Sequence, residues 1–122
     1  MRRVALGRTG LEVSAVGLGT SALGGVYGAV EEPEAFATVD PAFALGITLF
    51  DTAPAYGATR SETVLGRALR GVARESYVLS TKAGKTTSES GVDSFDFSES
   101  GVRRSVSESL ERLGTDRLDI VH

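Results

Sequence analysis

A chain of 122 residues, 41% hydrophobic and 24% charged, has the composition of an ordinary globular protein with at most one domain. Its formal net charge of −3 gives no electrostatic reason to expect a nucleic acid or an anionic membrane as a partner. The chain has no cysteine, which excludes disulfides, thiolate metal sites and cysteine nucleophiles.

Targeting and membrane signals are also missing from the pattern. No apolar run approaches the roughly 20 residues that a membrane-spanning helix needs. The arginines at positions 2 and 3 are not followed by the apolar segment of a secretory signal. We therefore expect a cytoplasmic protein without a membrane partner.

The first predicted elements are short and rich in glycine. Val4–Leu6 and Leu11–Val13 flank the turn residues 7–10, which predicts a small hairpin. Residues 15–18 form a short apolar run typical of a first buried strand. A glycine-rich loop is expected from Gly19 to Gly28.

A helix is predicted over Glu31–Leu45. Pro41 lies inside it and removes a backbone donor, so we expect a kink there or two shorter pieces. Gly46 is suited to end the helix. The apolar stripe comprises Ala35, Val39 and Phe43.

The middle of the chain alternates between strand and helix patterns. Ile47–Phe50 predicts a second strand and Tyr77–Ser80 predicts a third. Between them, Ser61–Leu69 predicts a helix with Ser61 as its N-cap and Glu62 in the first turn. The apolar face of this helix comprises Val64, Leu65, Ala68 and Leu69.

The last third begins with residues 84–97, which are rich in Ser, Thr and Gly without periodicity and predict a long loop. Ser98 is expected to cap a helix that runs to Leu113 and is stopped by Gly114. Residues 118–122 begin a fourth strand. The residues expected to face inward are Val102, Val106, Ser109, Leu110 and Leu113.

This alternation predicts an α/β fold with a parallel sheet. Four such units are half of a (β/α)8 TIM barrel, which typically needs about 250 residues. We therefore expect residues 1–122 to be the N-terminal half of such a barrel, with a leading β-hairpin and a truncation in strand 4. An open half barrel exposes a strand edge and an apolar face, so we expect self-association and no activity from the chain alone.

Polar groups that could carry chemistry follow the second and third predicted strands. Asp51 and Lys82 come directly after apolar strand residues, and Tyr56 follows in a loop with Pro and Gly. Because parallel strands end at the same edge, the carboxylate and the ammonium can pair if the strands are neighbours. An ammonium beside a phenol favours the phenolate, which suits general acid–base catalysis. The alternatives are a capping Asp and a solvated Lys.

The same stretches resemble the aldo/keto reductase family, in the same order along the chain. The similar segments are residues 6–14, 16–20, 50–57, 61–69, 80–82, 105–114 and 116–121. The resemblance implies a (β/α)8 barrel that transfers a hydride between NADP(H), with NAD(H) possible, and an aldehyde, ketone or sugar substrate. It implies that Tyr56 is the acid, tuned by Lys82 and Asp51. It also implies that Gly19, Thr20 and Asp51 lie at the nicotinamide ribose.

His122 is the single histidine and invites a catalytic assignment. In the family pattern the catalytic histidine falls five residues after the position that matches Asp119, whereas His122 falls three after it. We therefore expect His122 to be an interior residue of the barrel with a hydrogen-bond partner. The catalytic position would be the second residue past the end of this sequence.

Two other functions are compatible with parts of the sequence. Residues 17–22 match a dinucleotide-binding glycine pattern, but that pattern needs a helix immediately afterwards, and the glycines at 24, 25 and 28 oppose one. The chain could also be a binding or regulatory subunit of the same fold, without turnover. No metal-ligand cluster is visible, and no metal is expected.

Overall fold

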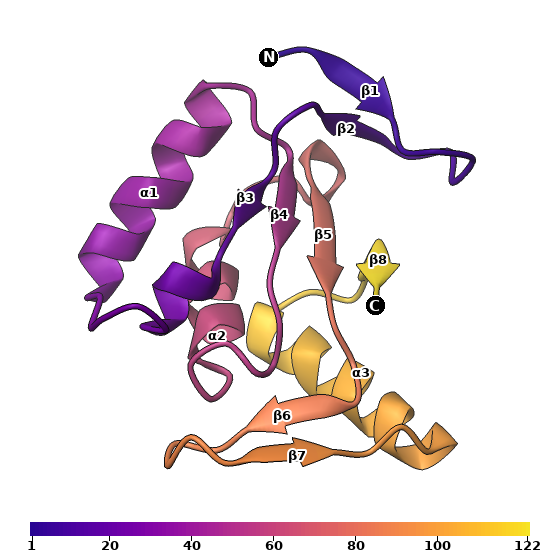
Figure 1. The fold of residues 1–122 in the computed structure, drawn as a ribbon. Helices are drawn as coiled ribbons and strands as arrows, with labels where there is room; N and C mark the ends of the chain where they lie inside the picture. Colours follow the sequence, from indigo (N-terminus) through magenta and orange to yellow (C-terminus); the bar gives the residue numbers. More distant parts are fainter.

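The computed structural model describes all residues, 1–122, and its centre is a four-stranded parallel sheet (Figure 1). The strand order is β3-β4-β5-β8. The strands are β3 (Leu18–Gly19), β4 (Leu49–Asp51), β5 (Val78–Thr81) and β8 (Ile120–Val121). Consecutive strands are neighbours, so the predicted parallel sheet is confirmed.

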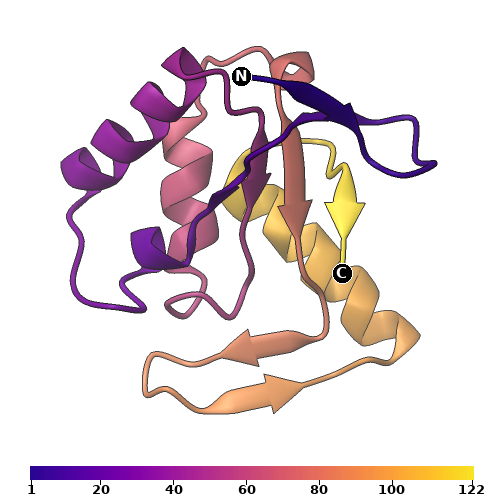
Figure 2. The same ribbon diagram turned by 45° about the horizontal axis from the view of Figure 1, so that its top comes forward.

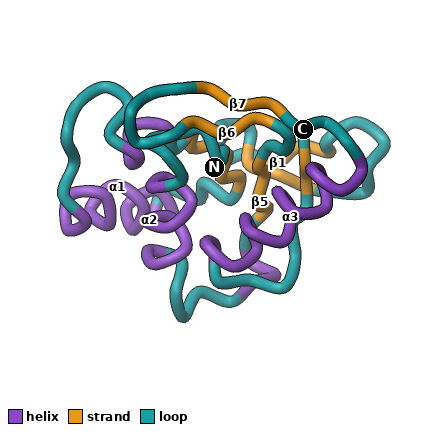
Figure 3. Tube along the Cα trace, turned by 90° about the horizontal axis from the view of Figure 1, so that it is seen from below, coloured by secondary structure: helices purple, strands orange, loops and turns teal.

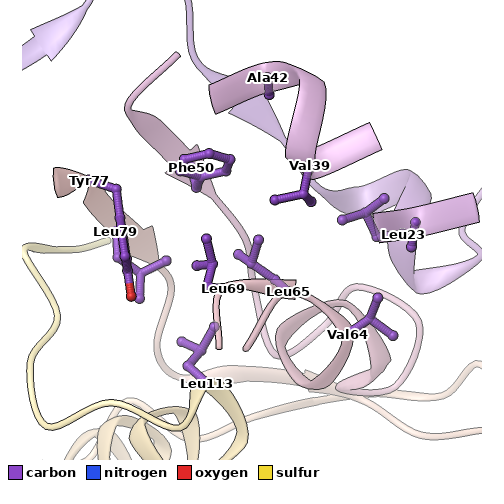
Figure 4. Close-up of a cluster of buried hydrophobic side chains, with 11 residues drawn as sticks. Leu23, Val39, Ala42, Phe50, Val64, Leu65, Leu69, Tyr77, Leu79 and Leu113 are labelled. Atoms are coloured by element: carbon purple, nitrogen blue, oxygen red, sulfur yellow. The ribbon is translucent and has the colours of Figure 1, made fainter. Parts of the chain in front are cut away.

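Three helices cover one face of this sheet, as the tilted view shows (Figure 2). They are α1 (Glu32–Ala44), α2 (Arg60–Ala68) and α3 (Glu99–Leu113). Between helices and sheet lies one apolar core, centred on the fully buried Phe50 and Leu65 (Figure 4). The core also contains Leu23, Ala35, Val39, Ala42, Val64, Leu69, Tyr77, Leu79 and Leu113.

Two hairpins lie at opposite ends of the sheet. The leading hairpin, β1 (Arg3–Ala5) with β2 (Glu12–Ser14), was predicted and lies at the amino ends of the strands (Figure 1). The second hairpin, β6 (Lys85–Thr87) with β7 (Asp93–Phe95), lies at the carboxyl ends of the strands. Figure 3, in which the molecule is seen from below, shows the two strands of this hairpin side by side. The prediction of a long loop over residues 84–97 is therefore wrong. These strands pair only with each other, and β7 is exposed throughout.

Helix α1 runs in one piece through Pro41, so the two-piece alternative is wrong. Pro41 still accepts the backbone hydrogen bond of Leu45, at 2.9 Å. The buried stripe of Ala35, Val39 and Ala42 packs on the core and outweighs the one donor that proline removes.

The other differences are local. The first strand begins at Leu18 rather than at residue 15, and the expected glycine-rich loop contains a 3₁₀ turn at Ser21–Gly24. That turn buries Leu23 in the core, and no α-helix opens from the glycine pattern at 17–22. A second 3₁₀ turn, Arg74–Ser76, precedes β5.

The helix ends test the predicted caps. Ser98 caps α3, because its hydroxyl accepts from the Gly101 backbone at 3.1 Å, and Gly114 ends the helix with a φ of 64°. Ser61 is not the cap of α2. Thr59 holds that position, and Ser61 lies inside the helix with its side chain fully buried.

The inward face of α3 is shifted from the prediction. Its buried residues are Gly101, Ser105, Ser109 and Leu113, whereas Val102, Val106 and Leu110 are half-buried. The buried face of α3 therefore carries mostly small side chains, which allow the helix to pack closely against the rest of the protein. No helix in the structure has both the length and the apolar character to cross a membrane.

Candidate active site

Asp51 and Lys82 meet at the carboxyl ends of two neighbouring strands. Asp51 is the last residue of β4 and lies opposite Ser80 of β5, two residues before Lys82. The Lys82 Nζ atom lies 2.8 Å from Asp51 Oδ2. The side chains of both residues keep more than a third of their surface exposed, so the pair faces solvent. The predicted pairing of these two side chains is present in the structure.

Additional hydrogen bonds fix the geometry of this pair. Ser80 Oγ donates to Asp51 Oδ1 at 2.9 Å, and Lys82 Nζ also donates to the Thr52 carbonyl at 3.0 Å. An ammonium has three donors. Two go to Asp51 and Thr52, and the remaining neighbour is Tyr56, whose ring centroid lies 5.0 Å from Lys82 Nζ. Asp51, Lys82 and Tyr56 therefore form one cluster.

The loop that carries Tyr56 is held by close backbone contacts. Tyr56 donates its N–H to the Ala53 carbonyl at 3.1 Å and accepts from the Ser61 N–H at 3.2 Å. Gly57 adopts a φ of 62°, and a Cβ there would overlap the Gly24 carbonyl. Only glycine allows this approach. The position of the phenol is thus set by the packing of two glycine-containing segments.

The surroundings of Lys82 change its pKa in two directions. Burial lowers the pKa, and the hydrogen bonds and charges of Asp51 and Tyr56 raise it, with a net rise above the ordinary value of 10.5. Lys82 therefore stays an ammonium at neutral pH. It is a fixed positive charge beside the Tyr56 phenol rather than a base.

The residues predicted to lie at the ribose of a cofactor differ in how accessible they are to a ligand. Gly19 lies opposite Asp51 in the sheet, and there is nothing within 4 Å of the place where a Cβ would project. Thr20 is fully buried, and its hydroxyl donates to the Asp51 carbonyl at 2.9 Å. The groups open on the rim are thus Gly19 and the Asp51 carboxylate, while the Thr20 hydroxyl is engaged within the chain.

Ser80 is a site residue that the sequence reasoning missed. The sequence pattern predicts it only as the end of a strand. The signal was available, because the register of parallel strands places Ser80 beside Asp51 once the ends of the two apolar runs are aligned. Its hydroxyl holds one carboxylate oxygen while Lys82 holds the other.

A hollow of about 680 Å³ lies beside the Tyr56 loop, and Ala55, Gly57 and Arg60 meet the tip of the β6–β7 hairpin there. Another, of about 740 Å³, lies between the ends of α2 and α3 and contains none of the clustered residues. The first hollow is also lined by none of Asp51, Tyr56 and Lys82, but it adjoins the Tyr56 loop at the carboxyl ends of the strands, where barrels of parallel strands carry their chemistry.

His122 lies outside the cluster. It is exposed, and it is held through its backbone, which donates to Thr81 and accepts from Ala83. Its side chain has no hydrogen-bond partner among residues 1–122, and the expected interior position in a complete barrel stays a prediction. No group of three or more His, Cys, Asp or Glu residues could hold a metal ion.

Comparisons with known proteins show the family of the chain. The profile of the Aldo/keto reductase family matches residues 15–122. The chain belongs to the aldo/keto reductase family. It is 52% identical over 120 residues to L-galactose dehydrogenase of Arabidopsis thaliana and 37% identical over 132 residues to D-threo-aldose 1-dehydrogenase of a Pseudomonas species. These alignments cover 97% and 93% of the chain.

A solved structure shows the same fold. A putative aldo-keto reductase from Pseudomonas aeruginosa superposes with a TM-score of 0.85 at 47% identity over 98% of the chain. The chain spans 44% of that protein, 36% of the Arabidopsis enzyme and 40% of the Pseudomonas dehydrogenase. The fold is therefore the N-terminal half of a (β/α)8 barrel, with the predicted leading hairpin.

Proposed function

We propose that this chain contributes the acid–base residues of an oxidoreductase that interconverts a carbonyl compound and its alcohol. The single observation that carries the proposal is the position of Lys82. Its ammonium joins the Asp51 carboxylate, at 2.8 Å, to the face of Tyr56, at 5.0 Å from the ring centroid. Such a cluster is suited to proton transfer at a carbonyl oxygen.

Each residue has a distinct role in this proposal. The Tyr56 hydroxyl gives its proton to the carbonyl oxygen as the carbon is reduced, and takes one back from the alcohol in oxidation. The Lys82 ammonium stabilises the phenolate that remains. Asp51 holds that ammonium in place and charged.

The hydride chemistry would come from a bound NADP(H), with NAD(H) as the alternative. The residues present fit the nicotinamide-ribose end of such a molecule. Gly19 leaves open space at the rim, and the partly exposed Asp51 carboxylate next to it can accept hydrogen bonds from ribose hydroxyls. Thr20 supports this edge by holding the Asp51 backbone.

A sugar or small aldehyde is the proposed substrate class. Two relatives are named as dehydrogenases of L-galactose and of D-threo-aldoses. The hollow beside the Tyr56 loop is lined by Arg60, Thr87 and Glu89 together with small residues. Such charged and hydroxyl groups suit the many hydroxyls of a sugar.

We also propose that residues 1–122 form the first part of one barrel domain, cytoplasmic and without a nucleic-acid partner. The β8 strand is at the edge of the sheet, and Val121 is 44% exposed. Such an edge suits a further strand, from the same polypeptide or from a second copy. Intact mass and solution size of the protein from its natural source distinguish these two arrangements.

The function is tested by titrating the protein at its native length with NADPH and with NADH. Nicotinamide fluorescence reports binding, and oxidation of an aldose such as L-galactose reports turnover. Binding together with turnover supports the proposal. Binding without turnover of any aldose or aldehyde would favour a binding or regulatory subunit, and the absence of both would overturn the proposal.

A further inference from the structure

Three threonines at the ends of three adjacent strands are fully buried. Thr20 follows β3, Thr52 follows β4, and Thr81 is the last residue of β5. Each lies next to a residue of the candidate site: Gly19, Asp51 and Lys82, respectively. A buried hydroxyl needs a hydrogen-bond partner, so the partners of these threonines show what holds the strand ends.

Ser61 of α2 is the partner for the first two strands. Its hydroxyl lies 2.6 Å from the Thr20 carbonyl, 2.9 Å from the Thr20 hydroxyl and 3.1 Å from the Thr52 hydroxyl. A hydroxyl has one proton, and a carbonyl can only accept. Ser61 therefore donates to the Thr20 carbonyl and accepts from Thr52, which ties the end of β3 to the end of β4.

Glu62, the next residue of α2, is the partner for the third strand. Thr81 Oγ1 donates to Glu62 Oε1 at 2.6 Å, and Arg112 Nε of α3 donates to Glu62 Oε2 at 2.7 Å. The Glu62 side chain is fully buried, and that of Arg112 is 19% exposed. The end of β5 is thereby tied to both α2 and α3.

Neither side chain caps the helix in which it lies. The N-cap of α2 is Thr59, and no side chain caps the helix. Burying a carboxylate is costly even when it is paired, and an apolar residue of similar volume often packs as well. A buried polar pair at this place therefore indicates a geometric requirement that apolar packing alone would not meet.

We infer that Ser61 and Glu62 are positioning residues, which hold the ends of β3, β4 and β5 in register so that Asp51 and Lys82 meet. The two side chains touch neither the Lys82 ammonium nor the Asp51 carboxylate. They act through Thr52, whose carbonyl accepts from Lys82, and through Thr81, which directly precedes Lys82. The inference rests on the proposed function only in treating the Asp51–Lys82 pair as catalytic.

Competitive acylation of the two lysines measures this geometry directly. Residues 1–122 contain only two lysines, Lys82 and Lys85, and peptide mass spectrometry gives the ratio of their acetylation from one sample of the protein at native length. Acylation needs a neutral amine, and the groups that face Lys82 and hold it charged are Asp51 and Tyr56. Lys85 lies on β6, where its ammonium pairs with Asp93 at 2.8 Å and makes no contact with Ser61 or Glu62, and it serves as the internal reference.

The decisive variant is T81V, which removes one hydroxyl and keeps the branched shape. We expect the Lys82-to-Lys85 ratio to rise about threefold to tenfold, because a fall of one pKa unit gives ten times more neutral amine. T81S keeps the hydroxyl and should retain the original ratio. T63V, a matched control on α2 whose hydroxyl contacts only the Thr59 carbonyl, should also retain it.

Circular dichroism establishes that each variant is folded before its ratio is interpreted. If T81V does not fold, S61A tests the contacts of Ser61 instead. This substitution removes the hydrogen bond between Ser61 and the Thr52 hydroxyl and should also raise the ratio. An unchanged ratio in a folded T81V or S61A variant would overturn the inference. The labelling uses neither cofactor nor substrate, so it stands or fails separately from the reductase proposal.

Discussion

The two ends of the parallel sheet each carry an ion pair across neighbouring strands, and the pairs are built differently. At the carboxyl ends, Lys82 and Asp51 are 35% and 38% exposed. At the amino ends, Arg74 and Asp119 are 16% and 10% exposed, with Nη2 and Oδ2 2.6 Å apart. The first pair leaves room for a ligand, and the second does not.

The amino-end pair is saturated by the chain itself. Asp119 Oδ2 also accepts from the Leu79 backbone at 2.8 Å. Arg74 donates further to the carbonyls of Tyr77 and Arg117, and its guanidinium lies 4.7 Å from the Tyr77 ring centroid. The contacts of Arg74 with Arg117 and Asp119, and that of Asp119 with Leu79, hold the start of β5 to the start of β8.

This difference in exposure suits the two ion pairs to different roles, one in stability and the other in the reaction. In barrels of this kind, the amino ends of the strands serve stability and the carboxyl ends carry the reaction. A saturated pair has no group left for a substrate, whereas the open pair includes an ammonium beside a phenol. Substitutions at the two ends should therefore change different measurements.

The largest effect is expected from Y56F. Removing the hydroxyl removes the proton donor, and general acid catalysis contributes about 100-fold to 10,000-fold. We expect kcat/KM to fall by that factor in the protein at native length, with an unchanged melting temperature. Y27F, at a tyrosine that is 82% exposed, is the matched control and should leave turnover unaltered.

At the amino ends, R74M should lower stability strongly. The substitution leaves Asp119, whose side chain is only 10% exposed, without its main partner, and breaking a largely buried pair costs about 3 kcal/mol in the free energy of unfolding. Urea denaturation measures this change. R117M is the control, because Arg117 is 53% exposed and 3.4 Å from the same carboxylate, and it should cost less than about 1 kcal/mol. Equal losses would contradict the distinction between a buried and an exposed partner.

K82M should have the opposite effect from R74M, with a small loss of stability and a large loss of turnover. The pair is partly exposed, so we expect a stability change below about 1 kcal/mol, as for other solvent-facing ion pairs. Turnover should nevertheless be lost to a large extent, because the phenolate loses its counter-charge. K85M breaks a similarly exposed pair with Asp93 and should leave turnover intact. Retained turnover in K82M would show that Lys82 is structural.

The smallest effect concerns pH. The folded-state pKa of Lys82 is raised above 10.5 by Asp51 and Tyr56 despite the opposing effect of burial. The stabilisation from this pair is therefore complete below about pH 10.5 and is lost as the pH rises through the folded-state value. Urea denaturation of the wild type and of K82M from pH 7 to pH 11 should give a constant difference that shrinks only at the alkaline end.

The Asp51–Lys82 pair could be predicted because two features of the sequence are enough to place it. Both residues follow apolar runs, and parallel strands end at one edge of the sheet. The β6–β7 hairpin could not be predicted, because its strands are short and mostly polar, β7 is exposed throughout, and the sequence therefore shows no alternation of apolar and polar residues.

Ser61 shows how a correct residue received the wrong role. A serine at the start of a helix suggests a cap, and this was the prediction. Ser61 also lies three and four residues before Val64 and Leu65, which places it on the buried face of α2. Only the strand ends beneath it reveal what it binds, because its contacts with Thr20 and Thr52 join distant parts of the chain.

The central claim is that Lys82 acts through Tyr56, and a double-mutant cycle on turnover tests it most directly. Rates of aldose oxidation are measured for the wild type, Y56F, K82M and Y56F/K82M at native length. Our account predicts that the double variant is no slower than Y56F alone, because an ammonium without a phenol has nothing to stabilise. Losses that multiply would show two independent roles and would contradict the account.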